Sequence, residues 1–161
     1  APEYLAFLGA ELGLDNAQSD HRAQDLLERL ELSHAKNRRI RTFSTGMCKR
    51  LALAGALIAN PEVLLLDEPT ARLDPFGTAT VMAILRERSA QGTAILMASH
   101  HLLEVDGTCD DALLLHRRSG ACFVPAPCLE LLELAASGPH ALLGRSFVRC
   151  YVGAAGRWRH R

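Results

Sequence analysis

Two adjacent carboxylates follow a short apolar run, in a position suited to binding a metal ion. The run from Val63 to Leu66 is wholly apolar and ends at Asp67, which predicts a strand buried on both faces of a parallel sheet. Asp67 then stands at the carboxyl end of that strand, where α/β folds bind ligands and where Mg²⁺ would take a carboxylate oxygen. Glu68 projects to the other face and could orient or deprotonate a water. The alternative is two acids that cap a strand before the turn at Pro69.

A second candidate site is the start of the helix that precedes this strand. Ser44 is a good N-cap, and apolar residues repeat after it at helical spacing as far as Asn60. The free N–H groups and the positive dipole end of such a helix start suit an anion, and Gly46 lies in this first turn. The alternative is an ordinary capped helix.

Two further polar residues stand where an α/β fold would bring them near this chemistry. Asp74 followed by Pro75 predicts the start of another helix. Thr93 to Ala98 is predicted as the next strand, so His100 would lie at the same sheet edge as Asp67 and could hydrogen-bond a phosphate oxygen. A histidine at a strand end is more often structural, and it is the order of all four segments that favours a functional role.

The rest of the pattern predicts an α/β fold in which strands alternate with helices and pair in parallel. Helices are expected at Glu3 to Leu14, Asp20 to Leu32, His101 to Gly107 and Pro127 to Ala135, and strands at Ala112 to Leu115 and Cys122 to Val124. The basic link from Lys36 to Arg41 is expected to be solvated surface.

Composition and charge exclude several classes of protein. The 161 residues are 48% apolar and 22% charged, which is typical of a globular domain and unlike a disordered chain. Bases and acids number 18 each, so there is no general electrostatic case for binding nucleic acid. No apolar run approaches the roughly 20 residues that span a bilayer, so we expect no transmembrane segment.

The charges are unevenly distributed along the chain. All 18 acids and 13 of the bases lie in residues 1–133, whereas residues 134–161 hold five arginines and no acid. Residues 137–161 are therefore expected to form a basic tail, either solvated or docked on phosphate or anionic lipid. The five cysteines are expected to be reduced thiols. The alternative, a metal cluster of Cys122, Cys128 and His116, fits zinc spacing poorly.

Taken in order, these segments resemble the second half of an ABC-type ATPase, the ATP-binding subunit of ABC transporters. The matching motifs are the signature loop (Ser44-Thr45-Gly46-Met47), the Walker B strand (Val63 to Asp67), the catalytic carboxylate (Glu68), the D-loop (Ala71 to Asp74) and the switch histidine (His100). The similarity runs from about Glu3 to Ala135. Thr45 and Met47 replace the usual Gly and Gln, as they do in many export-type subunits.

The resemblance implies a P-loop NTPase-like fold that is incomplete, with a helical subdomain at 1–60 and the Walker B half of the parallel sheet at 61–136. It implies ATP and Mg²⁺ as cofactors. The resemblance implies that the signature loop contacts ATP held by an opposite subunit, through Ser44, Thr45, Gly46 and Met47. It implies that Asp67 binds Mg²⁺, that Glu68 polarises the attacking water and that His100 contacts the γ-phosphate. Asp74 would signal across a head-to-tail dimer.

One part of the family pattern has no match. A P-loop needs a Gly-Lys pair, but the two lysines, Lys36 and Lys49, follow Ala35 and Cys48, and the Q-loop is missing too. The leading hypothesis is therefore the C-terminal portion of an ATPase that drives export, inactive alone. One alternative is a non-catalytic partner that lends its signature loop in trans to a complete subunit. A DNA-repair-type ABC ATPase is a minor alternative, because no sustained heptads precede Ser44.

The resemblance also implies partners and a location. Residues 2–41 would contact a membrane-spanning transporter subunit, and a second ATP-binding subunit would complete a head-to-tail dimer. Such a protein works in the cytoplasm, peripheral on the inner face of the cell membrane. The sequence contains no match for the strands that should flank the strand beginning at Val63. We therefore also predict an exposed apolar sheet edge.

Overall fold

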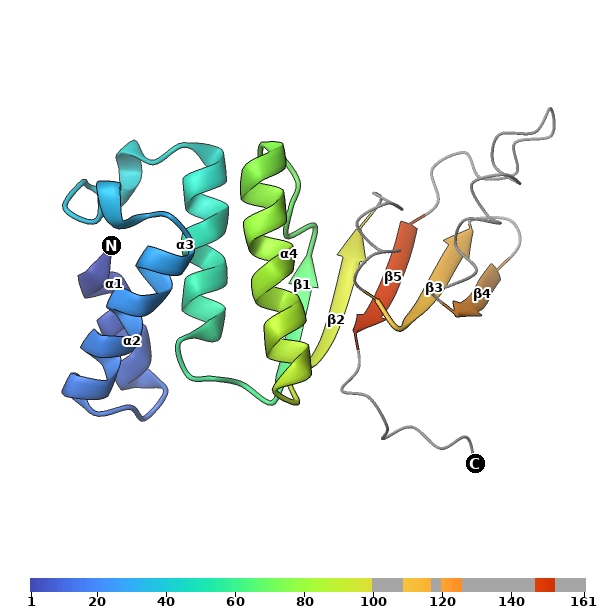
Figure 1. Ribbon diagram of the computed structural model, residues 1–161, viewed down its shortest axis with the longest axis horizontal. Coiled ribbons are helices and arrows are strands. Elements are labelled where there is room, and N and C mark those ends of the chain that lie inside the picture. The colour runs from blue at the N-terminus through green and yellow to red at the C-terminus, as the bar shows by residue number, and fades with distance from the viewer. Residues whose placement is uncertain (100–108, 117–119, 126–146, 153–161) are drawn as a thin grey trace. The chain divides into compact units, whose positions relative to one another are not determined.

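The computed structural model describes residues 1–99, 109–116, 120–125 and 147–152 (Figure 1). The chain divides into two compact units. The first holds Ala1–Pro61 and Thr70–Ala83, and the second holds Glu62–Pro69 and Ile84–Arg161. The helices expected at 101–107 and 127–135, and the predicted site residue His100, lie outside the described residues.

The first unit is helical, as its sequence predicts. Its elements are α1 (Pro2–Glu11), α2 (Asn16–Arg29), the short 3-10 helices η1 (Ser33–Ala35) and η2 (Ile40–Thr42), α3 (Thr45–Leu57) and the first part of α4 (Pro75–Ala90). Helix α2 begins before the expected Asp20, because the Asp15 side chain caps it. The Asp15 carboxylate accepts a hydrogen bond from the Gln18 amide at 2.7 Å.

Leucine and isoleucine side chains fill the core of this unit, and two glycines allow its helices to approach closely. The largest fully buried side chains of the unit include Leu5, Leu27, Leu30, Leu32, Leu57 and Ile58. A Cβ atom added at Gly9 of α1 would lie 2.5 Å from Ser19 Oγ of α2, and one added at Gly55 of α3 would lie 2.9 Å from Leu8 Cδ1. Helix α1 therefore packs closely on both neighbours, and a larger residue at either glycine would force the facing side chain to shift.

Substituting Gly9 with alanine should lower the free energy of unfolding by about 1–3 kcal/mol, because the new methyl overlaps the Ser19 hydroxyl. Ser19→Ala alone should be neutral or stabilising, since the buried Ser19 Oγ has no hydrogen-bond partner among the described residues. Urea denaturation of both single variants and the double variant measures the coupling. An undiminished cost of Gly9→Ala in the Ser19→Ala background would contradict this packing.

The second unit contains a five-stranded sheet with the order β1-β2-β5-β3-β4 (Figure 1). The strands are β1 (Val63–Asp67), β2 (Ala94–Ser99), β3 (Asp111–His116), β4 (Gly120–Pro125) and β5 (Phe147–Val152). Strands β1 and β2 are parallel, as predicted. The β2–β5, β3–β5 and β3–β4 pairs are antiparallel, so the prediction of parallel pairing throughout is wrong. Strand β5 lies within residues 137–161, for which the sequence pattern predicts no element.

Strand β1 forms one edge of this sheet and exposes one apolar face. Leu64 is 4% exposed, whereas Val63 and Leu65 on the opposite face are 61% and 71% exposed. Leu96, the cross-strand partner of Leu65, is 39% exposed. Among the described residues, no strand pairs with the outer side of β1. The prediction of burial on both faces is therefore wrong, and that of an exposed apolar edge is confirmed.

Candidate functional site

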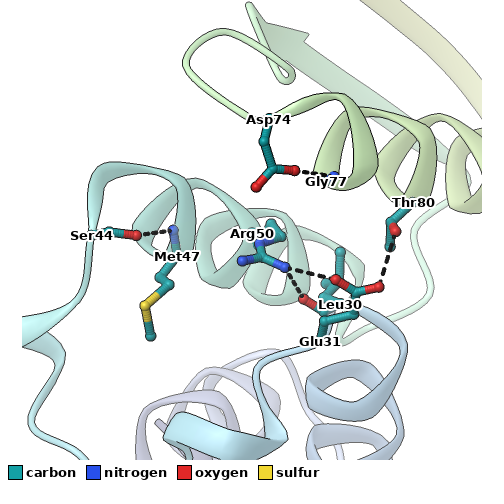
Figure 2. A network of polar contacts seen from close by, with 8 residues as sticks. All are labelled: Leu30, Glu31, Ser44, Met47, Arg50, Asp74, Gly77 and Thr80. Carbon is teal, nitrogen blue, oxygen red and sulfur yellow. Dashed lines mark hydrogen bonds and ion pairs between the residues drawn. The ribbon is translucent and has the colours of Figure 1, made fainter.

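Ser44 caps helix α3, as its sequence context predicts. Its Oγ accepts a hydrogen bond from the Met47 amide at 3.2 Å (Figure 2). Ser44 and Thr45 are exposed, whereas the Met47 side chain is only 7% exposed. A serine hydroxyl that accepts in this way still carries a proton it can donate. The exposed start of α3 thus offers a hydroxyl and first-turn amides, while the Met47 side chain packs into the core.

The segment before α4 packs against this helix start. A Cβ atom added at Gly46 would lie 3.3 Å from Leu73 Cδ2 and 3.7 Å from the Arg72 carbonyl oxygen. The segment is held in a turn by the Leu73 amide, which donates to the Thr70 carbonyl at 3.0 Å. The turn therefore packs on the first turn of α3 within the first unit, and a side chain at residue 46 would crowd Leu73 rather than the backbone.

Asp74 caps helix α4 from the end of that turn. Its Oδ1 accepts a hydrogen bond from the Gly77 amide at 2.6 Å (Figure 2), and Pro75 is the first residue of the helix. Both helix starts proposed as site elements, at Ser44 and at Asp74, are therefore capped as predicted, and both belong to the first unit.

Replacing Asp74 with alanine should destabilise the chain by about 1 kcal/mol, because the Gly77 amide loses its acceptor. Asp74→Asn should cost much less, since asparagine caps helices about as well as aspartate does. Urea denaturation of the two variants measures the difference. Equal losses for both would mean that the charge, and not the capping bond, stabilises α4.

The two predicted carboxylates lie together at the carboxyl end of β1, in the second unit. Asp67 is the last strand residue and is exposed. The Glu68 amide donates to the Ala98 carbonyl at 2.9 Å, and Glu68 has a φ of 48°. A left-handed backbone at a non-glycine residue is uncommon and turns the chain sharply. Glu68 therefore keeps one backbone bond to β2 while its backbone turns the chain away after the end of β1.

The chemistry of these donors suits a hard cation bound with help from other oxygens. An exposed carboxylate such as that of Asp67 can give Mg²⁺ one or two oxygens, with phosphate and water completing the shell. Among the described residues, no group of three His, Cys, Asp or Glu side chains could hold a metal by itself. The neighbouring strand β2 ends at Ser99, which is fully buried.

Known proteins share this fold and part of this sequence. Residues 4–71 match the family model described as ABC transporter. A solved structure titled "Structure of ATP binding subunit of ABC transporter" aligns with a TM-score of 0.63 and 27% identity, over 68% of this chain and 46% of that one. The fold is that of an ABC transporter ATP-binding domain.

Curated relatives of this chain include ATP-binding proteins named for import and for resistance. The cobalt import ATP-binding protein CbiO of Salmonella typhi is 34% identical over 136 residues, which cover 80% of this chain and 49% of that protein. The daunorubicin resistance ATP-binding protein DrrA3 of Streptomyces coeruleorubidus is 45% identical over 89 residues, 55% of this chain and 28% of that protein. The chain spans about half the length of the curated relatives named here or less, and 61% of one further relative, an ABC transporter ATP-binding protein of Bacillus subtilis.

Some features of the structure could not be predicted from sequence motifs. The helix starts at Ser44 and Asp74 follow from local capping signals. The ion pair between Arg50 and Glu31 does not, because it joins residues 19 apart in the sequence. Glu31 also has a left-handed backbone, with a φ of 58°. The sequence gives no signal for this conformation, because the residue is not glycine.

Proposed function

We propose that this chain is the ATP-binding part of an ABC transporter in which ATP hydrolysis drives export across a membrane. The observation that carries the proposal is the exposed, capped start of α3. The Ser44 hydroxyl accepts from the Met47 amide and keeps a proton to donate, and the amides of Thr45 and Gly46 belong to the first turn, which lacks acceptors within the helix. Together they form a site for a phosphate group, here the γ-phosphate of ATP held by an opposite subunit.

The carboxyl end of β1 supports the second part of the proposal. Asp67 would hold Mg²⁺ through its exposed carboxylate, and Glu68 would polarise the water that attacks the γ-phosphate. His100 follows the buried Ser99 in the sequence and would donate a hydrogen bond to the phosphate. Asp74 would report the state of this site across a head-to-tail dimer. Export as the direction is supported by Thr45 and Met47 in the signature loop and agrees with the similarity to a daunorubicin resistance protein.

We further propose that residues 2–41 contact a membrane-spanning subunit on the cytoplasmic side. Helix α1 supports this, because it presents apolar side chains to solvent. Tyr4, Phe7 and Leu12 are 41%, 60% and 57% exposed, and exposed apolar patches of this kind mark interaction sites. No helix among the described residues is long and apolar enough to cross a membrane.

A second candidate function is that of a non-catalytic partner. The observation that favours it is the lack of any Gly-Lys pair in the 161 residues, since a P-loop depends on that lysine. In this case the chain lends the start of α3 to ATP bound by a complete subunit and does not itself hold the nucleotide.

ATP-dependent pairing with a complete ABC subunit tests the phosphate site. DrrA3 is a suitable partner, and size-exclusion chromatography with and without ATP and Mg²⁺ provides the measurement. We expect a complex only with ATP. Ser44→Asp should weaken it at least about tenfold, because aspartate caps α3 as serine does but places a negative charge against phosphate. Ser33→Asp, at an exposed residue of η1, is the matched control. Equal binding by the two variants would refute the site.

A further inference from the structure

We propose that Glu31 is a positioning residue whose carboxylate, together with Arg50, fixes the start of α3 relative to the start of α4. The inference rests on the proposed function, because the two helix starts carry Ser44 and Asp74. All of these residues belong to the first unit, and Figure 2 shows the contacts among them.

The backbone of Glu31 is held in a conformation that glutamate rarely adopts. Helix α2 ends with a pair of bonds in which the Glu31 amide donates to the Glu28 carbonyl at 2.9 Å and the Leu32 amide to the Leu27 carbonyl at 2.7 Å. This arrangement places residue 31 in the left-handed region, with a φ of 58°, where glycine is the usual residue. A glutamate there costs free energy that surrounding contacts must offset. The contacts of the Glu31 side chain can provide this compensation.

The Glu31 side chain joins two helices through its two oxygens. Arg50 of α3 donates from Nη1 to Glu31 Oε2 at 3.2 Å and to the Leu30 carbonyl at 3.1 Å. Thr80 of α4 donates from Oγ1 to Glu31 Oε1 at 3.4 Å. The Arg50 side chain is only 15% exposed and that of Glu31 38%, so solvent screens this pair less than a typical surface ion pair. One carboxylate thus contacts α3 with one oxygen and α4 with the other.

The contacts are placed symmetrically with respect to the two site residues. Arg50 stands six residues after Ser44, and Thr80 stands six residues after Asp74. Six helical residues span about 9 Å, so each helix is held at the same distance behind its N-terminal cap. A movement of the Glu31 carboxylate would therefore move both N-caps, Ser44 and Asp74. An ion pair without this role would allow Glu31 to be replaced without any change in the spacing of the helices.

The test measures the spacing of α3 and α4 directly in the full chain. Nitroxide labels are placed at Cys48, which is exposed, and at Ala83→Cys, an exposed position of α4 in the same unit. The other cysteines are replaced by alanine. Pulsed electron paramagnetic resonance then gives the distribution of distances between the labels for Glu31→Gly. The matched control is Asn60→Gly, because Asn60 also has a left-handed backbone, with a φ of 53°, and keeps Glu31.

We expect Glu31→Gly to broaden the distance distribution at least about twofold while the urea midpoint stays the same or rises, because glycine relieves the backbone. Asn60→Gly should leave the distribution narrow. In the pairing assay with DrrA3, Glu31→Gly should also weaken the ATP-dependent complex by about tenfold, the loss typical of one coupled charge pair. This loss without any loss of stability would distinguish positioning from a purely structural role.

An unchanged distribution in Glu31→Gly, or equal broadening in Asn60→Gly, would overturn the proposal. The distance measurement uses no nucleotide and no partner. If the wild-type chain fails to pair with DrrA3, the proposed function is refuted, and the distances still decide whether Glu31 sets the spacing of the two helices.

Discussion

The 161-residue chain on its own should bind ATP more than about a thousandfold more weakly than a complete ABC ATPase, and should show no ATP hydrolysis. A P-loop supplies several backbone amides and one lysine to the triphosphate, and charge-assisted bonds of this kind contribute about 1.5–3 kcal/mol each. Without a Gly-Lys pair, three or four such bonds are lost, which is more than three factors of ten in affinity.

Isothermal titration calorimetry with ATP and Mg²⁺ measures the affinity, and release of inorganic phosphate measures turnover. The Glu68→Gln variant, purified in parallel, reports any contaminating ATPase, because that substitution would remove the carboxylate proposed to polarise water. Turnover by the wild-type chain that disappears in Glu68→Gln would show that the chain is a complete catalyst. In that case the proposal of an inactive isolated chain would be wrong.

The chain should self-associate through the exposed edge of its sheet, and Leu65→Lys should abolish the association. Strand β1 has an unpaired outer side among the described residues. On one face it exposes Val63 and Leu65, with Leu96 beside them. Unpaired amides and carbonyls next to apolar side chains are a template for pairing with another strand, and a lysine on such a strand opposes it. Because Leu65 is 71% exposed, the lysine should not disturb the core.

Sedimentation velocity over a range of micromolar concentrations detects this association. Phe76→Lys is the matched control, since Phe76 is 69% exposed but lies in α4 of the first unit and not on the sheet. The expected result is a monomer for Leu65→Lys and concentration-dependent larger species for both wild type and Phe76→Lys. A wild-type monomer at every concentration would show that the edge of β1 does not recruit a second chain.

Local signals predicted the parts of the fold that carry the proposed site. Ser44 and Asp74 cap helices through bonds to amides three residues ahead, so the information lies within one turn of the chain. Asp67 and Glu68 follow an apolar run whose composition alone indicates a strand. These features could be read from the sequence because their causes are short-range.

The features that escaped prediction depend on partners distant in the sequence. Strand β5 contains Arg149 and lies in a region rich in arginine, and this charge pattern predicted a basic tail. In the structure, its backbone pairs with both β2 and β3. The burial of β1 depends on what packs against each of its faces, and its apolar composition is the same whether one face or both are covered. The role of Glu31 depends on Arg50 and Thr80, which no periodic pattern connects to it.

The position of β5 has a consequence for the order in which the chain can fold during synthesis. Strand β5 lies between β2 and β3, yet it is translated after both of them and after β4. The ribosome therefore releases β1 with β2, and β3 with β4, as two separate ribbons whose facing edges cannot yet be bridged. Completion of the sheet must wait until residues 147–152 emerge. A stop codon shortly before Phe147 would leave two disconnected pairs of strands and expose new edges to chaperones and proteases.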